Sequence, residues 1–150
     1  MNKGTFTAAS GIVHLAVQRD DGVETGRTID FNPSDQGFAD DLYGLVSKID
    51  KIHSEKTNAM QNAEDTAARF DIARSEDKEM RTAVDELFGE NFCRDVFGSV
   101  RLFALADGLT VIENFLLALL DKMDDSLTAN IAARDARIKK YTQKYSKYGK

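Results

Sequence analysis

The stretch of sequence that decides the fold runs from residue 32 to residue 52 and reads NPSDQGFADDLYGLVSKIDKI. It opens as a helix start, because an Asn32 or Ser34 side chain caps the first free amide groups. Pro33 is tolerated at the first helical position, and Asp35 suits the positive end of the helix dipole. Large apolar residues then recur at alternating spacings: Phe38, Leu42, Leu45, Ile49 and Ile52. This recurrence predicts an α-helix with a heptad seam along one side.

The seam keeps its phase for several more turns, through Ala59, Ala63, Thr66, Phe70, Ala73, Met80, Val84 and Leu87. Lys56 and Asp77 interrupt it, and positions 45–88 hold neither Gly nor Pro. We therefore predict helix over residues 34–88. The pattern leaves both a single rod and a helical hairpin open. We favour a long helix with a break or bend near residues 72–76, followed by a second helix.

The first 32 residues carry the pattern of a β-hairpin. A strand is expected from Ile12 to Val17, and Asp20-Asp21-Gly22 favours a tight turn because Asp-Gly readily adopts positive φ angles. A second strand is expected from Thr25 to Phe31, with Gly26 as the place for a bulge. A lone hairpin is only marginally stable in water, so it must pack on the helices or on a copy of itself.

Two Phe-Gly pairs punctuate the second half of the chain, at residues 88–89 and 97–98. They bracket one short turn of helix, since Gly favours helix ends. Residues 99–106 are expected to link onward, as a linker or a further helical turn. A final helix is expected from about Gly108 to Tyr145, with basic last turns. Its predicted apolar face consists of Ile112, Leu116, Leu119 or Leu120, Met123, Leu127, Ile131, Ile138, Tyr141 and Tyr145.

Together these signals predict one α+β domain that is predominantly α. The β-hairpin occupies residues 1–32, and long amphipathic helices in a helical hairpin or bundle occupy residues 33–146, with a basic C-terminal end. The chain has 150 residues, of which 42% are hydrophobic, so it is large enough to bury a core.

Charge is unevenly placed along the sequence. The whole chain carries −5, but residues 134–150 hold seven basic residues against Asp135 alone, a net +6, so the other 133 residues carry −11. An acidic body with a basic tail favours an electrostatic partner for the tail and argues against a general nucleic-acid binder, which would be basic over a whole face. The single cysteine, Cys93, suits a reducing compartment. With no signal peptide or membrane span in the pattern, we expect a cytoplasmic protein.

We find no residue pattern that indicates catalysis. His14 and His53 lie far apart, and neither belongs to a spacing typical of metal ligands. Cys93 has Arg94 beside it but no neighbouring base, so we expect a buried apolar residue rather than a nucleophile. The glycines form no phosphate-binding loop. We therefore expect a non-enzymatic protein without cofactor or metal.

Three segments together carry a resemblance to a known family. They are residues 29–35 leading into 38–42, residues 84–90 followed by 96–98, and the apolar run 115–120. In this order they resemble small tail-region proteins of siphophages and prophages of Gram-positive bacteria, described as tail assembly chaperones. The resemblance spans roughly residues 28–122. It implies a protein that coats the helical tape-measure protein before tail-tube subunits polymerise around it, with an apolar, self-associating working surface and no active site.

An amphipathic helix or groove is the usual way to hold another helix. We therefore expect client contacts at Leu42, Leu45, Ile49, Ile52, Leu116, Leu120 and Met123. The alternative for all seven is an intramolecular core. For function, the alternatives are a structural virion protein such as a head–tail connector, and a small phage-encoded inhibitor of a host or defence protein. We also expect a homo-oligomer.

Overall fold

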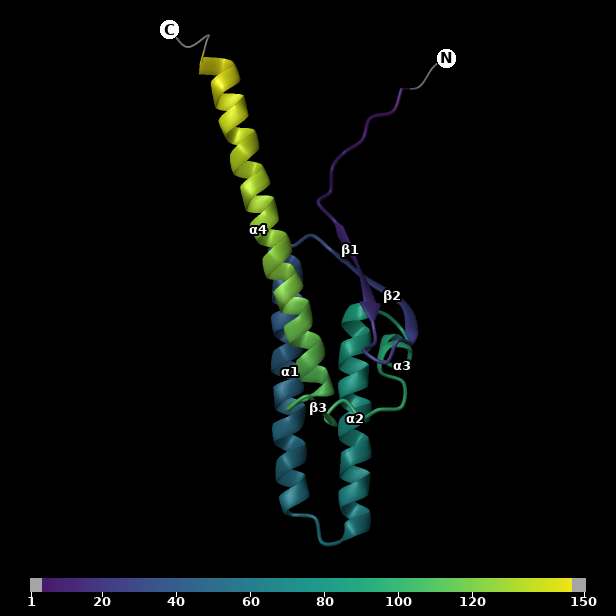
Figure 1. Ribbon diagram of the computed structural model, residues 1–150. Coiled ribbons are helices and arrows are strands. Elements are labelled where there is room, and N and C mark those ends of the chain that lie inside the picture. The colour runs from purple at the N-terminus through teal and green to yellow at the C-terminus, as the bar shows by residue number, and fades with distance from the viewer. Residues whose placement is uncertain (1–3, 147–150) are drawn as a thin grey trace.

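A computed structural model describes residues 4–146, although at positions 126, 127, 130, 134, 137, 138 and 140–146 it describes the backbone alone. The elements are β1 (Val13–Gln18), β2 (Glu24–Phe31), α1 (Gln36–Gln61), α2 (Thr66–Phe88), α3 (Phe92–Phe97), β3 (Leu105–Ala106), β4 (Leu109–Thr110) and α4 (Val111–Ser146). Figure 1 shows α1 and α2 as an antiparallel pair, with the β1–β2 hairpin beside α3 and with α4 running past the start of α1. The predicted class, α+β and predominantly α, is confirmed.

The β1–β2 hairpin has the turn that the sequence predicts. The Gly22 amide donates to the Arg19 carbonyl (3.2 Å), and Gly22 takes a φ of +83°. Gly26 has a φ of +67° and lies where the pairing between β1 and β2 shifts register, so the irregularity expected there is confirmed. The antiparallel pairing sets Leu15 opposite Ile29, and Ile29 and Phe31 face the core.

The start of α1 differs from the sequence prediction in its capping residue. Asp35, rather than Asn32 or Ser34, is the N-cap, and its carboxylate accepts the Gly37 amide at 2.9 Å. The Asn32 side chain instead accepts the Ser34 amide at 2.9 Å, in a turn that precedes the helix. Pro33 therefore lies before the helix rather than in its first turn, because two successive side chain-to-backbone turns precede the first helical residue.

The predicted break near residues 72–76 is wrong, because residues 34–88 form a helical hairpin that turns at 62–65. Asp65 ends the turn by accepting the Ala68 amide at 2.7 Å, and Asn62 closes α1 by donating its side-chain amide to the Asn58 carbonyl at 3.1 Å. Ser75 lies within α2 and accepts a hydrogen bond from Lys56 at 3.1 Å. Polar side chains therefore form the break between α1 and α2 without the help of Gly or Pro.

An aromatic cluster joins α3 to the helices on either side. Phe92 and Phe97 are buried, and Phe115 of α4 packs edge-on to Phe97, with ring centroids 5.5 Å apart. Gly89 and Gly98 flank α3 with φ angles of +120° and +60°, so the predicted short helix between the Phe-Gly pairs is confirmed.

The small β3–β4 hairpin occupies part of the segment that the sequence analysis expected to be a linker or helical turn. It leads directly into α4, which begins at Val111 rather than at Gly108. Thr110 and Glu113 form a reciprocal cap there: the Glu113 amide donates to the Thr110 hydroxyl at 3.2 Å, and the Thr110 amide donates to the Glu113 carboxylate at 3.1 Å. These two bonds fix the direction in which α4 leaves the core.

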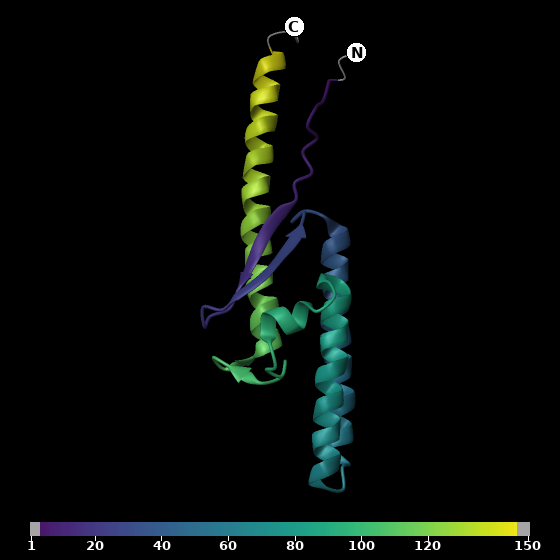
Figure 2. The same ribbon diagram turned by 90° about the vertical axis from the view of Figure 1, so that its right-hand side faces the viewer.

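Only the first turns of α4 belong to the core. Ile112, Leu116 and Leu119 are buried, whereas every described side chain from Leu120 to Lys139 is exposed except the half-buried Met123. The predicted face continues through Leu127, Ile138, Tyr141 and Tyr145, whose side chains lie outside the described residues. Figure 2 shows the far half of α4 extending beyond the body. Within the described residues, no helix has the length and apolar character needed to cross a bilayer.

Candidate protein-binding surface

The seven residues predicted to contact a client divide into two groups. Leu42, Leu45, Ile49, Ile52 and Leu116 are buried, at 9% exposure or less, in the core of the single chain. Leu120 is 41% exposed and Met123 is half-buried. In this structure the five residues of the first group are therefore part of the intramolecular core. Of the seven predicted contact residues, only Leu120 and Met123 are accessible to another polypeptide.

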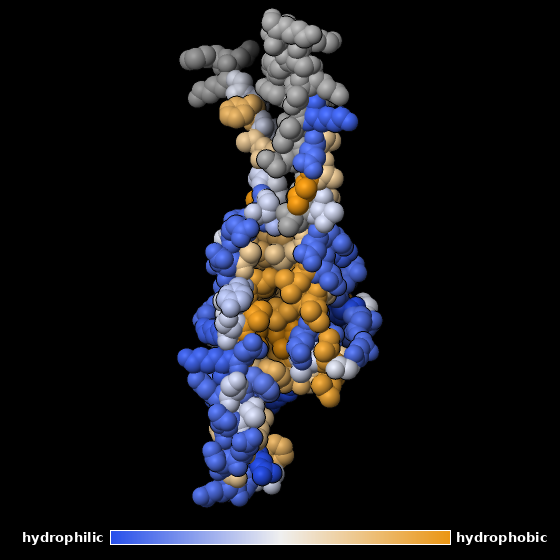
Figure 3. All heavy atoms as spheres, turned by 90° about the vertical axis from the view of Figure 1, so that its left-hand side faces the viewer, coloured by the Kyte–Doolittle hydropathy of each residue, from blue (hydrophilic) through white to orange (hydrophobic). Residues whose placement is uncertain are grey.

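An apolar face lies on the side of the molecule that carries the first turns of α4. In Figure 3 apolar side chains gather there between polar flanks. On α4, Leu117 and Leu120 are 49% and 41% exposed, and on α1 Val46 is half-buried against the core. We call Val46, Leu117, Leu120 and Met123 the α1–α4 face. The helical periodicity of the sequence did not identify Leu117 as part of an apolar face, because its side chain is offset by about 100° around the helix from the core-facing Leu116.

A groove lies on the other flank of α4, toward β1. It has a volume of about 570 Å³ and is lined mainly by apolar side chains of β1, α3, α4 and the loops after α3. Its lining includes Leu15, Val17, Phe97, Phe115 and Ala118, with Arg19 and Lys122 as charged members. Sequence periodicity gave no sign of this groove, because its walls come from four separate segments. We call it the β1–α4 groove.

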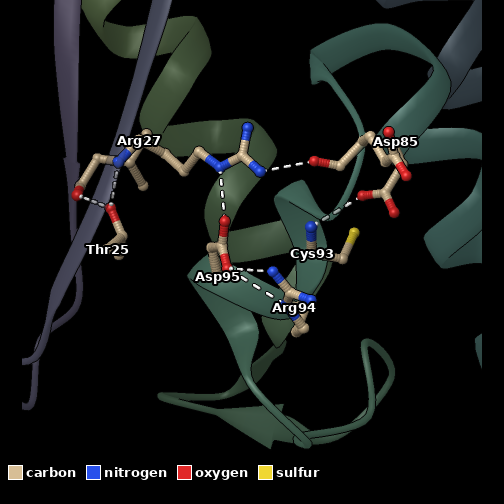
Figure 4. Close-up of polar contacts among 8 residues, drawn as sticks. Thr25, Arg27, Asp85, Cys93, Arg94 and Asp95 are labelled. Atoms are coloured by element: carbon tan, nitrogen blue, oxygen red, sulfur yellow. Dashed lines mark hydrogen bonds and ion pairs between the residues drawn. The ribbon is translucent and has the colours of Figure 1, made fainter.

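A polar contact fixes the β1–β2 hairpin to α3 (Figure 4). The Arg27 guanidinium donates to the Asp95 carboxylate at 2.8 Å and to the Glu90 carbonyl at 2.6 Å. The hydrogen bond from Arg27 holds the pKa of Asp95 below its usual value of 3.8. This contact bridges 68 positions in the sequence. It holds the two walls of the β1–α4 groove, β1 and α3, in place.

A buried carboxylate explains one interruption of the seam. Asp77, 9% exposed, accepts the Leu102 amide at 2.8 Å and the Arg81 guanidinium at 2.8 Å. A buried acid is stable only when its oxygens are paired in this way. Asp77 therefore fastens the 99–104 loop beneath α4. Lys56, the other interruption, pairs with Glu79 at 3.0 Å across α1 and α2.

The side chains that could take part in chemistry are Cys93, His14 and His53, and each of them is held in a structural contact. Cys93 is buried, and burial together with nearby Asp85 raises the pKa of its thiol well above the usual range, so the thiol stays protonated. His14 bonds to Asp30 at 2.7 Å on the exposed hairpin, and His53 stacks on Phe103 with ring centroids 4.4 Å apart. Among the described residues no three His, Cys, Asp or Glu side chains gather as metal ligands would.

Comparison with protein-family models, with curated proteins and with solved structures finds no match for this chain. The two surfaces beside α4 are therefore the features from which a function is inferred, together with the resemblance of the three sequence segments.

Proposed function

We propose that this chain is a non-enzymatic tail assembly chaperone. It binds the helical tape-measure protein in the cytoplasm of the bacterial host and helps to recruit tail-tube subunits. The observation that carries the proposal is the α1–α4 face, an apolar surface left open beside a core that is otherwise well covered.

The exposed apolar area of the α1–α4 face suits a helical client. An amphipathic helix docks its apolar stripe against an exposed apolar surface of this kind. Leu117 and Leu120 of α4 supply most of the exposed apolar area of this face, and half-buried Val46 of α1 adds to it. Contiguous exposed apolar surface of this kind is typical of a binding site.

Charge supports the same role. Residues 1–133 carry −11, and this net charge keeps a protein with exposed apolar residues soluble. The apolar face can therefore stay open until a client helix arrives. The resemblance of residues 28–122 to tail assembly chaperones supplies the identity of that client.

The proposal is tested by co-expression with the tape-measure protein encoded in the same phage or prophage. The chain should keep the tape-measure protein soluble and co-purify with it. The double variant Leu117→Ser/Leu120→Ser should fold normally by circular dichroism and lose at least about nine-tenths of the co-purified client, because the two leucines are the most exposed apolar residues of the α1–α4 face.

The matched control is Leu105→Ser, which removes a more exposed leucine (78%) from β3. It should leave the client bound. Loss of the client with Leu105→Ser alone, or retention of the client by the double variant, contradicts the proposal. Stoichiometric presence of the chain in finished virions would favour the structural virion protein instead.

A further inference from the structure

The outer part of α4 is a helix whose described side chains face solvent. From Leu120 to Lys139 these side chains are exposed except Met123, and Ile131 alone exposes 51% of its surface. Most of the stability of a helix in a protein comes from packing its apolar face against another element, and this part of α4 has no such element among the described residues. The arm therefore needs a partner along its apolar side.

The charges on this arm are arranged in two bands. Residues 121–125 hold three acids against Lys122, and all four of these side chains are exposed. Residues 134–144 hold five basic residues against Asp135. One arm therefore carries both members of a complementary pair of charge bands, separated by a neutral segment around Ile131.

We infer that two copies of this chain pair through their α4 arms, and that the arms are antiparallel. In that orientation the acidic band of each arm faces the basic band of the other, and the two arms cross near Ile131. A parallel pair would set basic band on basic band and acid on acid, which repels over distances shorter than the Debye length of about 8–10 Å. The proposal concerns self-association, so it does not depend on the tape-measure client.

The pairing also accounts for the place where α4 leaves the core. The reciprocal cap of Thr110 and Glu113 fixes the start of α4, and buried Ile112 and Leu116 anchor its first turns in the core. The arm thus projects from a fixed base, which presents its apolar and charged positions in a set direction. Pre-organisation of this kind lowers the entropic cost of association.

Sedimentation equilibrium on the purified full chain at low salt tests the association. A dimer is expected that weakens as salt rises. Asp124→Lys/Asp125→Lys should weaken dimerisation at least about tenfold. Arg134→Glu/Arg137→Glu/Lys140→Glu, which changes the net charge of residues 134–144 from +4 to −2, should do the same. Combining the five substitutions should restore most of the affinity, because the two bands then carry +2 and −2 in place of −2 and +4.

The matched control is Glu55→Lys/Glu64→Lys, which reverses two exposed acids near the α1–α2 turn, away from α4. It should leave dimerisation unchanged. A chain that stays monomeric at all concentrations overturns the proposal. So does a dimer that the control weakens as much as the α4 variants do.

Spin labels measure the orientation of the arms. Ala132→Cys and Lys139→Cys each place one label at an exposed helical position, and the unlabelled reference is the natural chain, whose Cys93 is buried. In an antiparallel pair crossing near Ile131, the two labels at 132 lie about 3 Å apart along the axis, and those at 139 about 24 Å apart. Equally short distances at both positions indicate parallel arms and overturn the proposal.

Discussion

Helices α1 and α4 have the same kind of apolar seam but different surroundings. In α1 the seam residues Leu42, Leu45, Ile49 and Ile52 are all buried, because α2 returns along them. In α4 the buried seam stops at Leu119, and the described side chains beyond it are exposed except Met123. A heptad pattern therefore indicates that one face of a helix packs against another polypeptide segment. Whether that segment belongs to the same chain depends on whether a later helix folds back along it, as α2 does along α1.

The largest effect should come from the covered helix. Leu45→Ala deletes buried side-chain volume from α1, so it should lower the free energy of unfolding by about 2–5 kcal/mol. Urea unfolding followed by circular dichroism measures this loss. Tyr43→Ala, which changes a 75% exposed residue on the same helix, is the control and should shift the value by less than about 0.5 kcal/mol. Similar losses for both variants would mean that α1 is not packed on α2 as described.

The buried carboxylate at the seam should come next. Asp77→Ala leaves the Leu102 amide and the Arg81 guanidinium without their acceptor, which should cost about 1–3 kcal/mol in the same measurement. Asp77→Asn keeps one side-chain oxygen as an acceptor and should cost less. If Asp77→Leu, which completes the heptad seam, proved more stable than the natural chain, the loop would not depend on this contact.

The sequence indicated most of the elements because their signals are local. The turn at Asp20-Asp21-Gly22 and the short helix between Gly89 and Gly98 follow from residues that favour positive φ angles. The apolar spacing of α1 follows from its own helical period. None of these features requires knowledge of what the segment packs against.

The sequence did not locate the α1–α2 turn, because Asp65 is one of several residues that cap helices and no Gly or Pro marks the break. Asp77 looked like a defect in the seam because its partner, the Leu102 amide, is 25 positions away. The β1–α4 groove and the exposure of Leu117 likewise depend on where α4 lies. Tertiary placement, not residue type, sets these features.

The contact between Arg27 of the hairpin and Asp95 of α3 should make the stability of the fold fall at low pH. Arg27 lowers the pKa of Asp95 relative to 3.8, so the ionised carboxylate stabilises the fold. That contribution is fully present above the unfolded pKa and is lost as pH falls below about 3.8 through the folded value. Asp95→Asn should therefore reduce the fall in melting temperature between pH 5 and pH 3. An unchanged acid profile would mean that Arg27 and Asp95 do not pair.

The smallest effect on stability should come from the uncovered helix. Leu120→Ala makes the same deletion as Leu45→Ala, but Leu120 is already 41% exposed and Ala has the highest helix propensity. The loss of unfolding free energy should be below about 1 kcal/mol. Its effect on client binding should be much larger, because Leu120 belongs to the α1–α4 face. Measuring both quantities on Leu45→Ala and Leu120→Ala separates a seam that holds the fold from one that serves another polypeptide. If Leu120→Ala destabilised the monomer as strongly as Leu45→Ala, α4 would be an ordinary core helix and the difference between the two seams would disappear.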